Sequence, residues 1–388
     1  MTQADRSPSG RRVLLAAGGT GGHLFPAEAL AAALHRRNIA VGLVTDPRAA
    51  RHAGAFPAEA VQVIPSATIR SRNPVSLAMT GAILAYGLTK AWLTLPRLRP
   101  AVVVGFGGYP TVPPLLAASY RDIPTVIHEQ NAVMGRANRM LAPHVRAIAT
   151  GFPGILNSEP ALAAKATHTG NPVRPAVIEA SAVPYPPLEA AGPVRLLVFG
   201  GSQGARVMAD VVPAAVERLE PRLQMHLKVT QQARAEDVER VRAAYARLQV
   251  AAEVAPFFAD LPARMAASHL VVARSGASTV AELAVVGRPA ILVPLPHALD
   301  QDQRANAGVL MQAGGAIRLD QDEFSPDRLA AEIAALAAEP GRLAAMAAAA
   351  RSLGAPDAAD RLADLVLRVA GMLPARHASP TVREGSSA

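Results

Sequence analysis

The chain has 388 residues, more than one hydrophobic core usually organises, so two domains are expected. Hydrophobic residues make up 51% and charged residues 18%, which is typical of a globular protein, and the absence of cysteine excludes disulfides, thiolate catalysis and cysteine-ligated zinc. The formal net charge of +9 fits an anionic membrane face or phosphorylated substrates, whereas 4% aromatic residues and no zinc-finger or RNA-recognition spacing argue against nucleic acid as a partner.

The first predicted strand, 13–17, leads into the glycine-rich loop AGGTGGH. The segment before it, MTQADRSPSGRR, has no apolar core and so predicts no secretory signal. A glycine turn between a strand and a helix lets a ligand approach the backbone, and bare N–H groups at the helix start suit phosphate. The loop lacks the final glycine of the dinucleotide pattern G-x-G-x-x-G and the Gly-Lys-Ser/Thr of a P-loop. Asp46, after the second predicted strand, keeps an NAD-binding interpretation open, but the sequence Asp-Pro-Arg favours a turn.

The uncharged segment 74–89 is shorter than the roughly 20 residues of a membrane-spanning helix, so no such helix is predicted. Within 70–99, however, apolar residues are flanked by basic ones, which is typical of an amphipathic helix on an anionic membrane surface. The apolar members are Val75, Leu77, Ile83, Leu84, Leu88 and Trp92, and the basic members are Arg70, Arg72, Lys90, Arg97 and Arg99. A buried core helix with solvated ends would explain the same composition.

Apolar runs alternate with helical patterns along most of the chain, which indicates parallel sheets covered by helices on both faces. The further predicted strands are 40–45, 101–104, 125–128, 194–199, 225–229, 270–273 and 290–293. A Pro-rich linker, 181–194, separates two halves, and each half opens on a similar strand and glycine loop, LLAAGGTGG and LLVFGGSQG. We therefore predict an α/β protein of two doubly wound Rossmann-like domains facing a central cleft.

The predicted domains span 11–175 and 190–354. The Ala-rich segment 355–372 is predicted to form a helix that packs back on the first domain. The remaining 373–388 is small, polar and Pro-containing, and is predicted to be a disordered tail.

Polar clusters follow several of the predicted strands. They are GFGGYP at 105–110, HEQN at 128–131, TGNPVR at 169–174, RSGASTVAEL at 274–283 and PLPHALDQDQRANA at 294–307. Singly, each has a structural explanation: Ser278 and Thr279 with Glu282 resemble a capping box, and His128 fits a core histidine. Because the carboxyl ends of parallel strands meet at one edge, the clusters together favour a sugar-nucleotide cleft.

Six ordered motifs resemble the MurG family of bacterial N-acetylglucosaminyltransferases over about residues 12–370. They are GGTGGHLFPAEAL, GFGGYPTVPP, HEQNAVMGRANR, TGNPVR, FGGSQGA and RSGASTVAEL. The resemblance implies a GT-B fold and inverting transfer of GlcNAc from UDP-GlcNAc to the MurNAc C4 hydroxyl of undecaprenyl-diphospho-MurNAc-pentapeptide (lipid I). The product would be lipid II of peptidoglycan synthesis. It further implies no cofactor and peripheral attachment to the cytoplasmic face of the inner membrane. The alternatives are a UDP-GlcNAc epimerase, transfer to another lipid, and a non-catalytic nucleotide-binding module.

Donor contacts are expected mainly in the second domain. Arg174 and Ser202 suit the charge that develops on the leaving diphosphate. By resemblance, Glu282 binds the ribose, Phe258 contacts uracil through its main chain, and Gln303 binds GlcNAc hydroxyls. The same resemblance gives the backbone wall around the nucleotide as Ala277, Ser278, Thr279, Val280 and Ala281.

In the first domain, Thr20, Gly21, Gly22 and Asn131 are expected to face the donor sugar and the acceptor diphosphate. His23 is the nearest group able to act as a base near neutral pH, or else it positions the acceptor's phosphates. Glu129 is a further candidate base. Asp300-Gln301-Asp302 and Asp320-Gln321-Asp322 look like D-x-D metal signatures but lack the expected context, so no metal is predicted.

Overall fold

The structure is a computed structural model that describes residues 12–18, 21–47, 50, 56–66, 73–189, 192–201, 204–296, 298 and 300–373. Predictions made for Thr20, Ser202, Arg70, Arg72 and the tail beyond residue 373 lie outside the described residues. The side chains of 75–77 also lie outside them, and with these the predicted membrane-facing Val75 and Leu77.

The first lobe is built on a seven-stranded parallel sheet in the order β3-β2-β1-β4-β5-β6-β7. Its strands are β1 Arg12–Ala16, β2 Ala40–Thr45, β3 Ala60–Val63, β4 Pro100–Gly105, β5 Thr125–Glu129, β6 Ala147–Thr150 and β7 Ala166–His168. Its helices are α1 Gly21–His35, α2 Pro74–Leu98, α3 Val112–Ser119, α4 Arg136–Leu141 and α5 Pro160–Ala163, with 3-10 turns at Tyr109–Thr111 and Ala142–His144. The central strands are apolar and buried on both faces, as expected of a covered parallel sheet.

The second lobe repeats this plan with six parallel strands in the order β10-β9-β8-β11-β12-β13. The strands are β8 Val194–Phe199, β9 Leu227–Gln232, β10 Ala251–Ala255, β11 Leu270–Ala273, β12 Ala290–Leu292 and β13 Ala316–Arg318. The helices are α7 Arg206–Glu217, α8 Pro221–His226, α9 Val238–Arg247, α10 Leu261–Ala267, α11 Ala277–Val286, α12 Asp302–Gln312, α13 Pro326–Ala338 and α14 Pro340–Ser352.

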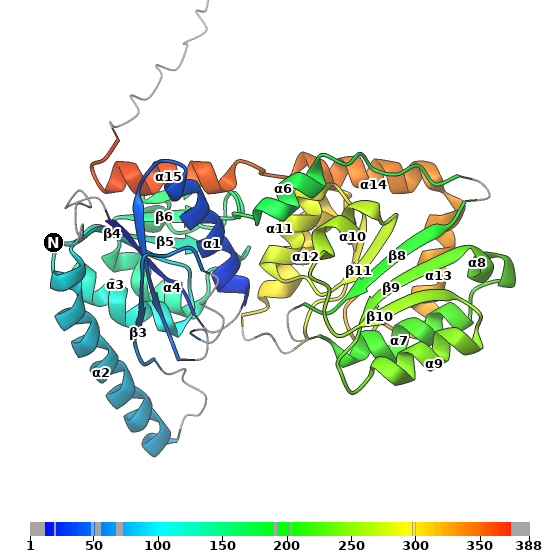
Figure 1. The fold of residues 1–388 in the computed structure, drawn as a ribbon, viewed down its shortest axis with the longest axis horizontal. Coiled ribbons are helices and arrows are strands. Elements are labelled where there is room, and N and C mark those ends of the chain that lie inside the picture. Colours follow the sequence, from blue (N-terminus) through cyan, green and yellow to red (C-terminus); the bar gives the residue numbers. More distant parts are fainter. Residues whose placement is uncertain are drawn as a thin grey trace, which may run out of the picture.

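Strand order reverses next to β1 in the first sheet and next to β8 in the second. The two glycine-rich segments follow these strands, so both lie at a topological switch point, where open α/β sheets bind ligands. In Figure 1 the two lobes lie side by side, with α1 of the first lobe and α11 and α12 of the second turned toward each other.

The last helix, α15 Ala358–Val369, belongs to the first lobe although the chain reaches it from the second. Its side chains Leu362 and Val366 are buried in the first lobe's core, and Asp360 pairs with Arg37 at 3.2 Å. The helix therefore completes the hydrophobic cover of the first sheet.

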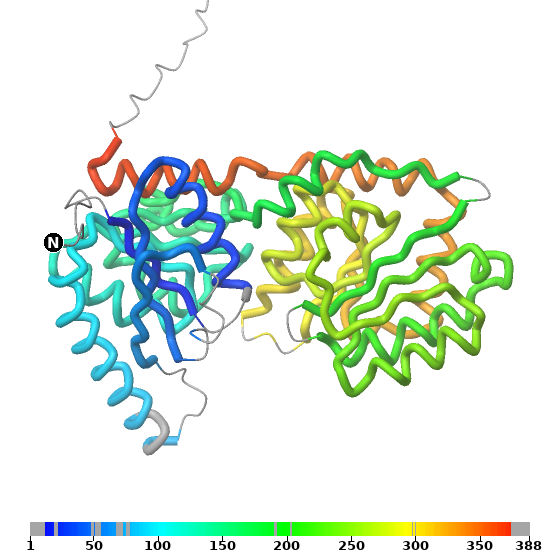
Figure 2. Tube along the Cα trace, in the orientation of Figure 1, coloured from blue at the N-terminus to red at the C-terminus, as the bar shows by residue number. Residues whose placement is uncertain are grey.

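The chain crosses between the lobes twice, and the crossings touch. Helix α6, Pro175–Ser181, follows the first crossing and packs against α10 and α11 of the second lobe. A Cβ placed on Gly170 in this crossing would lie 2.6 Å from the Cβ of Ala355 in the second. Gly170 has φ +80°, a region that favours glycine. Figure 2 shows the two passages running close together between the lobes.

Helix α2 lies at the outer edge of the first lobe (Figure 1). Met79, Tyr86 and Leu93 on this helix are each more than 60% exposed. Leu88, which was predicted to belong to the membrane-facing set, instead packs on the core beside the buried Leu95, so that part of the prediction is wrong. Within the described part of the chain no single helix is long and apolar enough to span a membrane; only α13 and α14 taken together pass that test, and they are bent by 98°.

Candidate functional site

Loops at the carboxyl ends of both sheets meet between the lobes. Asn306 of α12 is fully buried and connects them. Its Oδ1 accepts a hydrogen bond from the backbone N–H of Ala132 at 2.8 Å, and its Nδ2 donates to Asn131 Oδ1 at 3.0 Å and to the carbonyl of Ser275 at 3.2 Å. The predicted Asn131 therefore lies at the boundary between the lobes, held by a residue that the sequence analysis missed.

A second cross-lobe contact joins Arg136 Nε at the start of α4 to Asp300 Oδ1, at 2.9 Å. Ser275, at the carboxyl end of β11, also donates through its Oγ to the carbonyl of Gln303 at 2.8 Å. The segment expected to bind the nucleotide and the segment expected to bind the sugar are thus connected to each other and to the first lobe.

The buried carboxylate of Glu129 organises the loop after β5. Its Oε1 accepts from the backbone N–H and the Nδ2 of Asn131, and its Oε2 accepts from the Gly135 N–H and from Asn138 Nδ2, all within 2.8–3.1 Å. Burial raises the pKa of Glu129, and these four hydrogen bonds act to lower it. With both oxygens occupied, Glu129 fits a loop-holding role better than the role of a base.

His128, one residue earlier, is also buried, and its Nε2 donates to the carbonyl of Gly170 at 3.1 Å. Burial lowers the pKa of His128 to about 4, so it is neutral. The imidazole thus holds the first crossing segment and fits the core role considered for it.

His23 lies in the first turn of α1, directly behind the glycine loop. Its Nδ1 donates to the carbonyl of Gly18 at 3.2 Å, which makes Nε2 the basic nitrogen. A Cβ placed on Gly108 would lie 3.3 Å from the imidazole Cε1, so the loop after β4 packs closely against the ring. Burial lowers the pKa of His23, while the Gly18 hydrogen bond and the charge of Asp302 in the second lobe act to raise it. Near pH 7 His23 is therefore a neutral imidazole, packed among the first-lobe loops and within the electrostatic influence of Asp302 in the second lobe.

Glu282 and Arg174, predicted for ribose and diphosphate, contact each other. Arg174 Nη2 donates to Glu282 Oε1 at 3.1 Å, and the carboxylate is 7% exposed. Burial raises the pKa of Glu282, and the Arg174 charge acts to lower it. The guanidinium carbon of Arg174 also lies 4.5 Å from the ring centre of Phe25 in α1.

The start of α11 has no side-chain cap. Its N-cap residue is Gly276, so the capping-box explanation of Ser278, Thr279 and Glu282 is wrong. Ser278 Oγ is buried and has no hydrogen-bond partner among the described residues. The first backbone N–H groups of a helix lack intrahelical partners. The segment 277–281 therefore offers backbone and hydroxyl donors beside Glu282.

Gln303 and Phe258 are already engaged within the second lobe. Gln303 Oε1 accepts from the Leu295 N–H at 3.0 Å, which fixes the side chain near the start of α12. The buried ring of Phe258, in the loop after the edge strand β10, lies 4.3 Å from the guanidinium of Arg264.

Three of the D-x-D-like carboxylates, those of Asp300, Asp302 and Asp320, have protein partners. Asp300 pairs with Arg136, Asp302 Oδ1 accepts from the Gln303 N–H, and Asp320 pairs with Arg304 at 3.0 Å. No group of three His, Asp or Glu side chains suited to a metal ion occurs within the described ranges.

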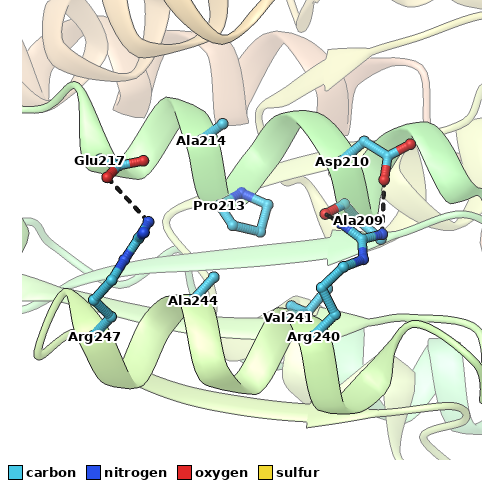
Figure 3. A pocket seen from close by; sticks show the side chains of 9 residues that line it. All are labelled: Ala209, Asp210, Pro213, Ala214, Glu217, Arg240, Val241, Ala244 and Arg247. Carbon is cyan, nitrogen blue, oxygen red and sulfur yellow. Dashed lines mark hydrogen bonds and ion pairs between the residues drawn. The ribbon is translucent and has the colours of Figure 1, made fainter.

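A separate groove lies between α7 and α9 (Figure 3). Its small side chains, Pro213, Ala214 and Ala244, lie between two ion pairs, Arg240–Asp210 and Arg247–Glu217. These helices cover the opposite face of the second sheet from α10 and α11. The groove is therefore not part of the cleft between the lobes.

Comparison with known proteins agrees with this geometry. Models of the glycosyltransferase family 28 N-terminal and C-terminal domains match residues 13–150 and 195–362. A Rhodopseudomonas palustris protein named UDP-N-acetylglucosamine--N-acetylmuramyl-(pentapeptide) pyrophosphoryl-undecaprenol N-acetylglucosamine transferase is 64% identical over 360 residues, covering 93% of this chain and 98% of the relative.

Among solved structures, Acinetobacter baumannii MurG superposes with a TM-score of 0.75 at 30% identity, over 92% of this chain and 99% of that one. A Neisseria meningitidis UDP-GlcNAc 2-epimerase superposes with a TM-score of 0.64 at 14% identity, over 92% of this chain and 100% of that one, which shows a shared fold alone. The predicted GT-B architecture is confirmed. The chain belongs to glycosyltransferase family 28, within the MurG family of N-acetylglucosamine transferases.

Proposed function

We propose that this protein transfers GlcNAc from UDP-GlcNAc to the C4 hydroxyl of MurNAc in undecaprenyl-diphospho-MurNAc-pentapeptide, forming lipid II of the peptidoglycan pathway. One observation carries the proposal. Between the lobes, the Arg174–Glu282 pair and the uncapped start of α11 lie beside α1. The first turn of α1 holds His23. The chain in which these groups come together is 64% identical to a relative named for this transfer.

The second lobe binds the donor in this proposal. Glu282 accepts hydrogen bonds from the ribose hydroxyls, and Arg174 faces the diphosphate together with Ser202. The segment Ala277–Ala281 forms the wall of the nucleotide site, Phe258 contacts the uracil through its backbone, and Gln303 holds GlcNAc hydroxyls through its amide. The partly buried Arg174–Glu282 ion pair and the Ser278 hydroxyl, which has no partner among the described residues, support a polar ligand at this position.

The first lobe supplies the acceptor side. Thr20, Gly21, Gly22 and Asn131 face the donor sugar and the acceptor diphosphate. The functional units are 11–175 for the acceptor and membrane and 190–354 for the donor, with 355–372 returning to the first lobe.

The reaction inverts the configuration at C1 of GlcNAc. The C4 oxygen of the acceptor attacks C1 from the face opposite the diphosphate, and the C1–O bond breaks with its electron pair leaving on UDP. The C4 hydroxyl proton passes to His23 Nε2, which is basic because Nδ1 carries the proton given to Gly18. Arg174 and backbone N–H groups stabilise the charge developing on the leaving diphosphate, so no metal or cofactor is required in this scheme.

Helix α2 supplies the membrane contact. Met79, Ile83, Tyr86 and Leu93 recur at helical spacing on one exposed face, which also carries Lys90 and Arg97. An exposed apolar face with basic residues fits peripheral binding to the anionic cytoplasmic face of the inner membrane. This face supports the membrane interpretation of 70–99 over a buried core helix.

The test is to incubate the purified protein with UDP-GlcNAc and lipid I in detergent. Formation of lipid II with release of UDP is expected. UDP-ManNAc or free ManNAc would instead identify an epimerase, and tight UDP binding without turnover would identify a binding module. A structure with UDP-GlcNAc bound away from Glu282 would overturn the donor site.

A further inference from the structure

Arg174 contacts both lobes from the segment where the chain passes between them. Its Nη2 reaches Glu282 of α11 at 3.1 Å, and its guanidinium carbon lies 4.5 Å from the centre of the Phe25 ring in α1. Phe25 is half-buried in the second turn of the helix that follows the glycine loop. One aromatic side chain of the first lobe thus packs on the cation expected to bind the donor in the second.

This contact leaves hydrogen-bonding capacity on the guanidinium. A guanidinium held against an aromatic ring can keep its N–H groups available for other partners, and the ring attracts the cation. Arg174 Nε is buried and has no hydrogen-bond partner within the described part of the chain. This enclosed N–H is an unsatisfied donor, and the Arg174 side chain as a whole is 24% exposed, so the cation keeps an exposed edge for an anionic ligand.

Glu28 supports the same placement of the cation. It lies three residues after Phe25 and therefore on the same face of α1. Burial raises the pKa of Glu28, and the positive charge of Arg174 acts to lower it. The face of α1 formed by Phe25 and Glu28 thus lies alongside Arg174.

We propose that Phe25 is a positioning residue for donor binding: its ring holds the Arg174 guanidinium beside Glu282 so that the remaining N–H groups face the donor diphosphate. Phe25 itself touches no substrate in this scheme. The inference rests on the donor site proposed above and extends it, because it makes a first-lobe side chain part of nucleotide recognition. It also explains why an aromatic residue follows the glycine loop.

The experiment measures UDP affinity by titration calorimetry for the wild type, Phe25→Leu and Phe25→Tyr. Leucine keeps an apolar side chain but removes the π face, whereas tyrosine keeps the face. We expect Phe25→Leu to weaken UDP binding about threefold to tenfold and Phe25→Tyr to stay within about twofold of wild type. Phe56→Leu is the matched control, since Phe56 is a partly buried aromatic packed against the first lobe's core; it should leave UDP affinity unchanged.

A double-mutant cycle separates positioning from packing. In an Arg174→Gln background, Phe25→Leu should cost no further UDP affinity, because the cation it positions is gone. Any one of three results would overturn the inference. Phe25→Leu could bind UDP as tightly as wild type, or Phe25→Leu and Phe25→Tyr could weaken UDP binding equally. In the Arg174→Gln background, Phe25→Leu could still reduce UDP affinity by its full factor. If Phe25→Leu alone is silent while Arg174→Gln and Glu282→Gln still weaken UDP binding, the proposed donor site stands without Phe25. If those two variants also bind UDP like wild type, the donor site itself fails.

Discussion

Asn306 and Asn131 join the two lobes through an amide hydrogen bond of 3.0 Å between side chains 175 positions apart in the sequence. The same Asn306 accepts from Ala132 and donates to Ser275, so its amide uses both donor and acceptor capacity. Because the side chain is fully buried, each of these groups would otherwise lose its hydrogen bond without gaining water. Asn306 therefore holds the cleft in this arrangement.

Asn306→Asp keeps the shape of the side chain and removes its N–H donors. A carboxylate oxygen would then face the Asn131 and Ser275 oxygens, an acceptor–acceptor contact. We expect kcat/KM for lipid II formation to fall roughly 5- to 100-fold and the radius of gyration by small-angle scattering to rise as the lobes separate. Gln312→Glu, at the exposed last turn of the same helix, is the charge-matched control. Unchanged activity and compactness in Asn306→Asp would contradict this role.

His23→Ala should reduce kcat by roughly 10²- to 10⁴-fold while leaving UDP affinity nearly intact, because it removes the proton acceptor and not a donor contact. Because burial lowers the pKa of His23, the imidazole should stay neutral at pH values where an ordinary histidine, with a pKa of about 6.5, is already protonated. The wild-type rate should therefore fall only at a lower pH, as the imidazole becomes protonated. A pH–rate profile of both proteins measures this. Full activity of His23→Ala would exclude the imidazole from the chemistry.

Arg174→Gln should make UDP binding sensitive to acid. Removing the cation takes away the charge that lowers the pKa of the buried Glu282 carboxyl, so that pKa rises further. Glu282 is then protonated at a higher pH than in wild type, and a protonated carboxyl accepts ribose hydroxyls less well. Calorimetric titrations between pH 5 and pH 8 should show UDP affinity decreasing at a higher pH than in wild type. An unshifted pH dependence would argue that Glu282 does not bind the ribose.

Tyr86→Asp together with Leu93→Asp should abolish binding to vesicles containing phosphatidylglycerol, since both side chains are more than 60% exposed on α2. Co-sedimentation measures the bound fraction, and binding by the wild type should weaken with salt. Met225→Asp, at a 76% exposed apolar position on α8 of the other lobe, is the control and should bind like wild type. Retained vesicle binding by the double variant would assign the membrane contact elsewhere.

Gly170→Ala should lower the melting temperature more than Gly371→Ala. Both glycines have positive φ, +80° and +68°, so both substitutions carry backbone strain. At Gly170 the new Cβ would collide with Ala355, whereas at Gly371 no heavy atom beyond the adjoining residues lies within 4 Å. The difference between the two variants in thermal unfolding therefore measures the crowding at the crossings. Equal effects would show that the contact is easily relieved.

Much of the fold follows from the sequence because its central strands are continuous apolar runs. The predicted 40–45, 194–199 and 270–273 match β2, β8 and β11 as observed. Edge and peripheral strands such as β3 and β10 were missed, since AVQV and AAEVA alternate weakly and are partly exposed. The strand predicted at 225–229 begins only at Leu227, because Pro221 starts α8.

The candidate site likewise combines residues that the sequence predicts with contacts that it does not. Its motif residues were found because polar side chains after buried strands are recognisable locally. The Arg174–Glu282 pair spans 108 positions, and its partners were predicted separately but not as a contact. Asn306 carries no local signal, because an asparagine inside a helix acquires its role only when the other lobe docks against it. Contacts of this kind depend on tertiary packing, which no window of sequence contains.

Because α15 returns to the first lobe, the molecule cannot be divided into its two lobes by a single cut in the chain. A fragment ending before Ala358 would lose Leu362 and Val366 from the core it is meant to contain, and would expose the apolar surface of α1 that they cover. A fragment beginning after the first crossing would carry α15 with no surface to dock on. Neither half is thus a self-sufficient polypeptide when cut at a single point, and reconstitution from pieces needs the last helix fused to, or supplied with, the amino-terminal piece.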